Sequence, residues 1–116
     1  MSDELLGTMM DALNEVLERA EAVLKRHCVS GYLCGEEVPN LGFKKVGDRW
    51  RLVWLEDGCE PFLVLGSSRE MRVRAARLVP ALDRALAAEA SEQGHQIRQA
   101  VVELERWVES HEAETK

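Results

Sequence analysis

The sequence has no apolar run long enough to cross a bilayer and no basic amino-terminal stretch of the kind that begins a signal peptide. The charged residues among the first eleven are all acidic: Asp3, Glu4 and Asp11. We therefore expect a cytoplasmic protein that does not associate with membranes.

Cysteine is scarce, and its odd count of 3 has no framework spacing, which favours reduced thiols over disulfides. His27, Cys28, Cys34 and Cys59 would be enough ligands for zinc, but structural zinc sites usually take cysteines in pairs about two to four residues apart. Cys28 and Cys34 are six apart, and Cys59 stands alone. We predict free thiols that pack as small apolar residues, with no metal and no cofactor.

Positive charge is in deficit, with 15 Lys and Arg against 21 Asp and Glu and a net charge of −6. The charge is uneven: residues 1–41 sum to −5, residues 42–77 to +3 and residues 78–116 to −4. A chain of this sign has an unfavourable long-range interaction with phosphate, so we expect no stable binding to nucleic acid.

Groups for catalysis are few and show no recognised pattern. His27, His95 and His111 lie in no nucleophile or metal motif, and the glycines between Gly35 and Lys45 do not have the spacing of a phosphate loop. The sequence therefore predicts a protein that is not an enzyme.

Residues 3–27 are predicted to form one helix, because apolar residues recur alternately three and four apart. These are Leu6, Met9, Leu13, Val16, Ala20, Val23 and His27, with Met10, Leu17 and Leu24 beside them. Glu15 with Arg19, and Glu21 with Lys25, are expected to be exposed pairs on this helix. The periodicity then stops, and the turn-forming residues of 28–40 predict a loop.

Residues 41–65 are predicted to form a three-stranded antiparallel meander with two-residue turns at Gly47-Asp48 and Asp57-Gly58. The first turn sets Leu41 opposite Trp54, and the second sets Trp54 opposite Pro61. Both registers place one apolar set on a single face, which we expect to be the core. The set is Leu41, Phe43, Trp50, Leu52, Trp54, Pro61, Leu63 and Leu65.

Two further helices are predicted, over 68–90 and 95–112, with the first capped by Ser67 or Ser68 and bent at Pro80. Residues 91–94 are either the connection between them or a weak point in one continuous rod. The second helix carries Ile97, Val101, Leu104, Val108 and His111 at the same spacing as the first helix. Residues 1–116 are thus interpreted as one α+β domain.

The basic centre, residues 44–77, is the candidate site for an anion or a partner's carboxylate, because serines at a helix start and arginines can bind such groups. Its members are Lys44, Arg49, Arg51, Ser67, Ser68, Arg69, Arg72, Arg74 and Arg77. Lys44 and Arg51 come out directly opposite one another, which is unfavourable unless an acidic group or anion lies nearby.

The helical stripes carry more apolar surface than one sheet face can cover, and exposed patches of this kind usually mark interfaces. We therefore expect a homodimer, joined through the first or the last helix, that binds an unidentified protein partner without catalysing a reaction. The alternative is a regulator that binds nucleic acid or a phosphorylated ligand through the basic centre.

Overall fold

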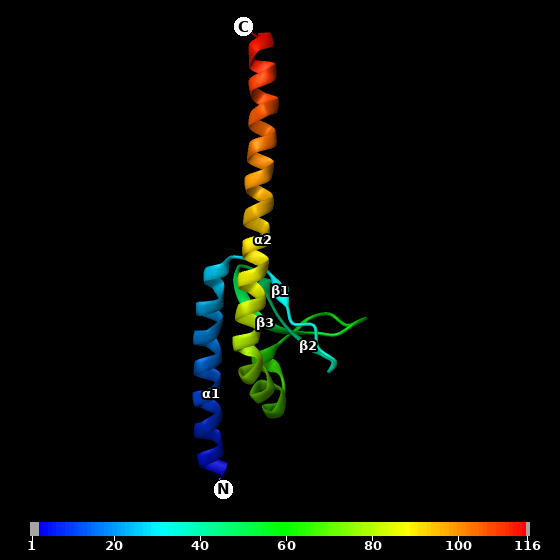
Figure 1. Cartoon of the computed structure of the whole chain (residues 1–116). Coiled ribbons are helices and arrows are strands. Elements are labelled where there is room, and N and C mark those ends of the chain that lie inside the picture. Colours follow the sequence, from blue (N-terminus) through cyan, green and yellow to red (C-terminus); the bar gives the residue numbers. More distant parts are fainter. Residues whose placement is uncertain (1–2, 116) are drawn as a thin grey trace.

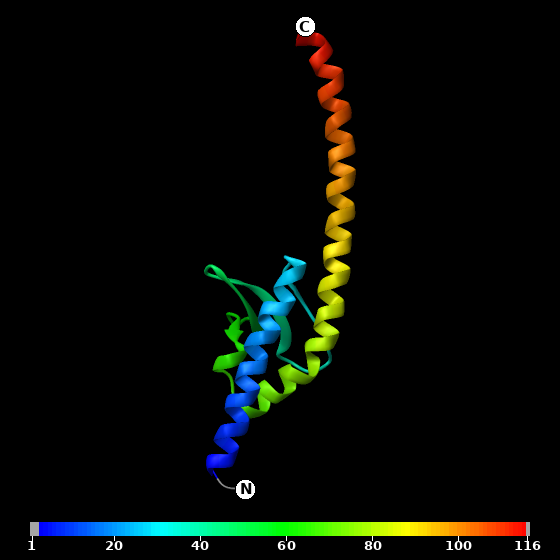
Figure 2. The same cartoon turned by 90° about the vertical axis from the view of Figure 1, so that its left-hand side faces the viewer.

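The computed structural model describes residues 3–115, which form two α-helices and a small antiparallel sheet. Helix α1 spans Asp3–Leu24 and continues into the 3₁₀ turn η1, Lys25–His27. Helix α2 spans Arg69–Thr115 without interruption. The two helices lie side by side and run in the same direction, and α2 continues far beyond the end of α1 (Figures 1 and 2). The protein is therefore α+β, as the sequence predicts.

The sheet has four strands in the order β1-β2-β3-β4, one more than predicted. They are β1 Gly31–Tyr32, β2 Asn40–Val46, β3 Arg49–Leu55 and β4 Phe62–Leu63. The extra strand, β1, lies in the predicted loop 28–40. The sequence did not predict it, because two residues are too few to show an alternating pattern. Gly31 lets β1 approach α2 closely, since a Cβ atom there would lie 2.8 Å from a methyl carbon of Leu86.

The predicted register of the first hairpin is confirmed. Leu41 lies opposite Trp54 and Lys44 opposite Arg51, and Gly47 takes a φ of +67° in the turn. Trp50 and Trp54 therefore share one face of the sheet with Leu52, as the sequence predicts.

The predicted register of the second hairpin is wrong by one residue. Trp54 lies opposite Phe62 rather than Pro61, and Pro61 is exposed. A turn does form over residues 56–59, closed by the N–H of Cys59 on the Glu56 carbonyl at 3.1 Å with Gly58 at φ +79°. Pairing resumes only at β4, after an extra residue, and Leu65 lies in the 3₁₀ turn η2, Val64–Gly66.

The core lies between the sheet and the two helices. It contains residues from the predicted sheet face together with two positions of α1, three of α2 and two from the segments that connect them: Leu17, Leu24, Val29, Leu41, Phe43, Leu52, Trp54, Val64, Ala75, Leu82 and Leu86. In α1 the buried residues Leu17 and Leu24 lie beside the predicted stripe, whereas Val16 and Val23 on that stripe are exposed. The helix is therefore rotated relative to the prediction.

One continuous helix replaces the two C-terminal helices that we predicted, which is a correction to the 68–90 and 95–112 boundaries. Side-chain hydrogen bonds support the helix through the weak stretch: Gln93 donates to Glu89 at 2.9 Å, and Gln96 donates to Glu92 at 3.2 Å. One helical glycine, here Gly94, costs only about 1 kcal/mol relative to alanine, which is too little to end a helix by itself.

The molecule is elongated because the second half of α2 leaves the core. It measures 78 × 27 × 24 Å, and its radius of gyration is 20.0 Å. A compact domain of 100 residues would have a radius of gyration of about 13 Å. Figure 2 shows α2 bent in its yellow-green part, where Pro80 lies, and nearly straight from there to its end. Within residues 3–115, no helix has the combination of length and apolar character that a membrane span requires.

Candidate functional site

The second half of α2, residues 91–114, forms a free arm that touches no other element of the chain in Figures 1 and 2. Its residues are exposed except for Gly94 and Val108, which are partly buried. Isolated helices are marginal in water even when their sequence favours helix, because most helical stability comes from packing of an apolar face. The arm therefore has no packed apolar face of this kind within the described residues.

The apolar face of the arm is the predicted stripe of the last helix. Ile97, Val101 and Leu104 are 63%, 48% and 60% exposed. Together with Val108 they follow a spacing of four, three and four, which places them on one side of the helix. We call Ile97, Val101, Leu104 and Val108 the arm seam.

Two aromatic rings lie beside the arm seam. Trp107 stacks on His111 with ring centroids 4.5 Å apart, and the indole is 58% exposed. Exposed tryptophan is a frequent contributor to protein interfaces, because it supplies a large contact area with few rotatable bonds. His111 also places Nδ1 2.8 Å from the Trp107 carbonyl.

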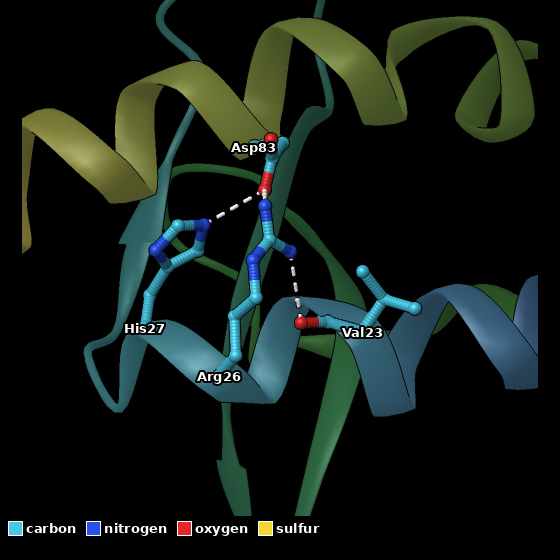
Figure 3. Close-up of polar contacts among 4 residues, drawn as sticks. All are labelled: Val23, Arg26, His27 and Asp83. Carbon is cyan, nitrogen blue, oxygen red and sulfur yellow. Dashed lines mark hydrogen bonds and ion pairs between the residues drawn. The ribbon is translucent and has the colours of Figure 1, made fainter.

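A polar joint connects the end of α1 to α2 just below the arm (Figure 3). Asp83 Oδ1 lies 2.7 Å from His27 Nε2 and accepts a hydrogen bond of 2.8 Å from Arg26 Nη2. Arg26 also donates to the Val23 carbonyl at 2.9 Å. The hydrogen bond with His27, helped by the positive charge of Arg26, lowers the pKa of Asp83. Sequence reasoning gave Asp83 no role, since nothing in the pattern shows which residue of α2 lies against the end of α1.

Glu21 was predicted to form an exposed pair with Lys25, and this prediction is wrong. It is 5% exposed, and its Oε2 accepts hydrogen bonds from the N–H of Leu52 at 2.7 Å and from Arg51 Nε at 3.2 Å. The only available signal was its position four after Leu17 and three before Leu24, in the middle of the buried face. Glu21 supplies the acidic group that the opposed pair of Lys44 and Arg51 needs.

The structure does not gather the basic centre into one site. Arg51 binds Glu21, whereas Arg72 donates to Asn14 at 2.8 Å and to the Ser67 carbonyl at 3.1 Å. Arg74 donates to the Pro39 carbonyl at 2.9 Å. Arg51 thus joins β3 to α1, Arg72 joins α2 to α1, and Arg74 joins α2 to the loop before β2.

The remaining basic residues are spread over the hairpin and α2. Lys44 and Arg49 belong to the hairpin, whereas Arg69 and Arg77 belong to α2. Within residues 3–115, none of these four has a hydrogen bond or ion pair to another side chain.

The two serines are both used within the fold. Ser68 caps α2 by accepting a hydrogen bond of 3.3 Å from the N–H of Met71. Ser67 Oγ donates to the Val64 carbonyl at 2.6 Å and lies 3.3 Å from the indole N–H of Trp54, which donates to it. Trp54 also has the Arg74 guanidinium over its ring, at 5.0 Å from the centroid.

A shallow groove of about 680 Å³ lies between the loop before β2 and the first turns of α2. Arg74 and Arg77 line it, but so do Glu36, Glu37 and Glu70. Because three glutamates outnumber the two arginines in this lining, the groove does not favour an anion.

The three cysteines are free and exposed, so the prediction that they pack as small apolar residues is wrong. Within the described residues, the structure brings together no group of three or more histidine, cysteine or acidic side chains that could hold a metal ion.

No family model, curated protein or solved structure matches this chain. Its function therefore has to be inferred from its own geometry, in which the arm seam is an exposed apolar stripe that no other described element covers.

Proposed function

We propose that this protein is a non-enzymatic protein–protein interaction module that works as a homodimer joined through the arm of α2. The observation that carries the proposal is the exposure of the arm seam, on the part of α2 that no other described element covers. Burying a valine, leucine or isoleucine side chain contributes roughly 1.5–3 kcal/mol, so pairing two arm seams is a strong driving force for association.

The arm is a better interface than α1, the other helix that the sequence left open. Helix α1 already packs Leu17 and Leu24 into the core, and its exposed apolar residues form only a flank, including Met9, Val16 and Val23. The arm has no packed face at all. In such a dimer the hairpin and α1 stay accessible, and we propose that they contact the unidentified protein partner.

The mass in solution, measured by sedimentation or light scattering at micromolar concentration, tests the homodimer. We expect twice the chain mass of 13.1 kDa. Replacing Leu104 by Glu should convert the protein to a monomer, because it places a charge in the middle of the arm seam. Val102→Glu is the matched control, since Val102 is 47% exposed on another side of the same helix.

A wild-type protein that sediments as a monomer would refute the homodimer. A Leu104→Glu variant that is folded by circular dichroism and still dimeric would remove the arm from the interface. Val16→Glu, on the exposed flank of α1, would then show whether α1 forms it.

A further inference from the structure

We propose that two copies pair their arms in antiparallel orientation, with Ile97 facing Val108 of the second copy and Val101 facing Leu104 of the second copy. This inference rests on the proposed function and adds the orientation and register of the interface. Three features of the chain carry it: the position of α1, the charges beside the arm seam, and the sizes of the residues around it.

Helix α1 lies on the side of α2 that continues as the arm seam. Asp83 contacts the end of α1 through Arg26 and His27, and Ala90, Ile97 and Leu104 follow it at intervals of seven residues. Residues seven apart stay on nearly the same side of a helix, with a drift of about 20° for each seven. A helix packed on the arm seam would therefore lie roughly in line with α1 (Figure 1).

Parallel pairing conflicts with this placement of α1. Packed helices lie about 8–10 Å apart, which leaves room between them for side chains only. In a parallel dimer, the α1 helices of both copies would have to enter that space immediately below the arm. In an antiparallel dimer the two globular parts lie at opposite ends, and each arm extends over its partner's arm towards the end of α1.

The charges beside the arm seam favour one antiparallel register. Arg98 and Glu105 each directly follow a seam residue, Ile97 and Leu104, and such flanking positions form the ion pairs that set orientation in coiled coils. With Val101 facing Leu104 of the second copy, Arg98 lies beside Glu105 of the second copy. The two-fold axis repeats this ion pair, so each dimer has it twice.

The neighbouring registers are worse. A shift of seven residues towards the globular part brings Arg98 beside Arg98 of the second copy. It also places the end of the second arm level with Asp83, where η1 already lies. A shift of seven residues away from the globular part brings Glu105 beside Glu105 of the second copy. It also leaves Ile97 beyond Val108, the last arm-seam residue of the second copy. Both shifts oppose like charges and lose seam contacts.

The sizes of the residues around the arm seam fit the same register. His111 faces Gly94 of the second copy, where a ring has the most room because glycine has no side chain. Trp107 lies next to Ala100 of the second copy. The stacked pair of rings is thus placed over Gly94 and Ala100, two of the smallest residues of the arm.

Disulfide trapping tests the orientation directly. In a background with Cys28, Cys34 and Cys59 changed to Ser, we expect Ile97→Cys alone and Val108→Cys alone to give no cross-linked dimer on oxidation. Residues 97 of the two copies are then eleven residues apart along the axis, or roughly 16 Å, which is beyond the reach of a disulfide. A mixture of the two variants should cross-link, and a mixture of Ile97→Cys with Val102→Cys should not.

The outcomes separate this inference from the proposed function. Cross-linking of Ile97→Cys to itself would show parallel pairing and overturn the inference, as would a dimeric protein whose mixed variants never cross-link. A protein that is monomeric at every concentration would overturn the proposed homodimer as well.

Reversing the charges tests the register. Arg98→Glu or Glu105→Arg alone should weaken the dimer at least tenfold in dissociation constant, whereas the double variant should restore it, because the pairs re-form across the interface. Arg106→Glu, an exposed change of the same charge on the arm, is the control and should have little effect. A double variant that is weaker than both single variants would overturn the register.

Discussion

The Glu21 carboxylate accepts the backbone N–H of Leu52 at 2.7 Å, so a buried side chain of α1 completes the hydrogen bonding of an edge of β3. Beyond this point β3 has no strand partner on that side, since β4 pairs only with Val53 and Trp54. The contact fixes how far α1 can slide along the sheet, because an unpaired N–H in the core is costly.

Replacing Glu21 by Ala should therefore destabilise the protein by about 1–3 kcal/mol, the cost of leaving a buried donor unsatisfied. Glu21→Gln should cost less, because its carbonyl oxygen can still accept from Leu52 while the attraction to Arg51 is lost. Urea denaturation measures both, with the exposed Glu18→Ala as control. Equal losses for the Ala and Gln variants would show that the charge, and not the hydrogen bond to Leu52, is what matters.

Asp83 makes stability depend on pH. Its pKa lies below its ordinary value of 3.8 in the folded protein, first because of the hydrogen bond with His27. A lowered pKa means that the carboxylate stabilises the fold fully above about pH 4 and that this stabilisation disappears as the pH falls through the lowered pKa.

Asp83→Asn should cost about 1 kcal/mol at neutral pH, because the joint is partly exposed to solvent. The difference in unfolding free energy between the wild type and the variant should shrink as the pH falls below 3.8. A difference that is the same at pH 3 and pH 7 would contradict the role of the charged carboxylate.

Leu52 is 1% exposed on β3, in the core between the sheet and the two helices. Leu52→Ala should cost about 2–5 kcal/mol, since the loss of buried methyl groups leaves a cavity that the surroundings fill only in part. Thermal unfolding measures this, and Val46→Ala, on an exposed position of the same hairpin, should change the midpoint little. Similar losses for both variants would place the core elsewhere.

The basic centre should bind duplex DNA weakly at most, with binding lost between low and physiological salt, because the rest of the chain is acidic. A salt titration of fluorescence anisotropy with labelled duplex measures this. Arg49→Glu and Arg69→Glu are suitable variants, because neither side chain holds the fold together within the described residues, unlike Arg72 and Arg74. Binding that survives physiological salt and is lost in these variants would favour the alternative function, a nucleic-acid regulator.

Much of the fold could be predicted because it depends on local chemistry. The alternation of apolar residues along 41–54 and the glycine at 47 together determine the register of the first hairpin, in which a slip of one residue would expose the whole core face. The predicted register of the second hairpin was wrong because its turn contains an extra residue. Residue types alone do not show how many residues separate a turn from the next pair of facing strand residues.

The sequence by itself determined the α+β class, the first hairpin and the apolar stripes of the helices, since these follow from spacing and turn chemistry. Only the tertiary structure decided which stripe is covered. Helix α1 buries Leu17, Glu21 and Leu24, which lie beside its predicted stripe, and Glu21 accepts the N–H of Leu52 there. The equally regular stripe of the arm stays exposed because no other part of the described chain extends that far. The spacing of apolar residues shows that one face of a helix is apolar. Which element packs against that face depends on where the rest of the chain lies.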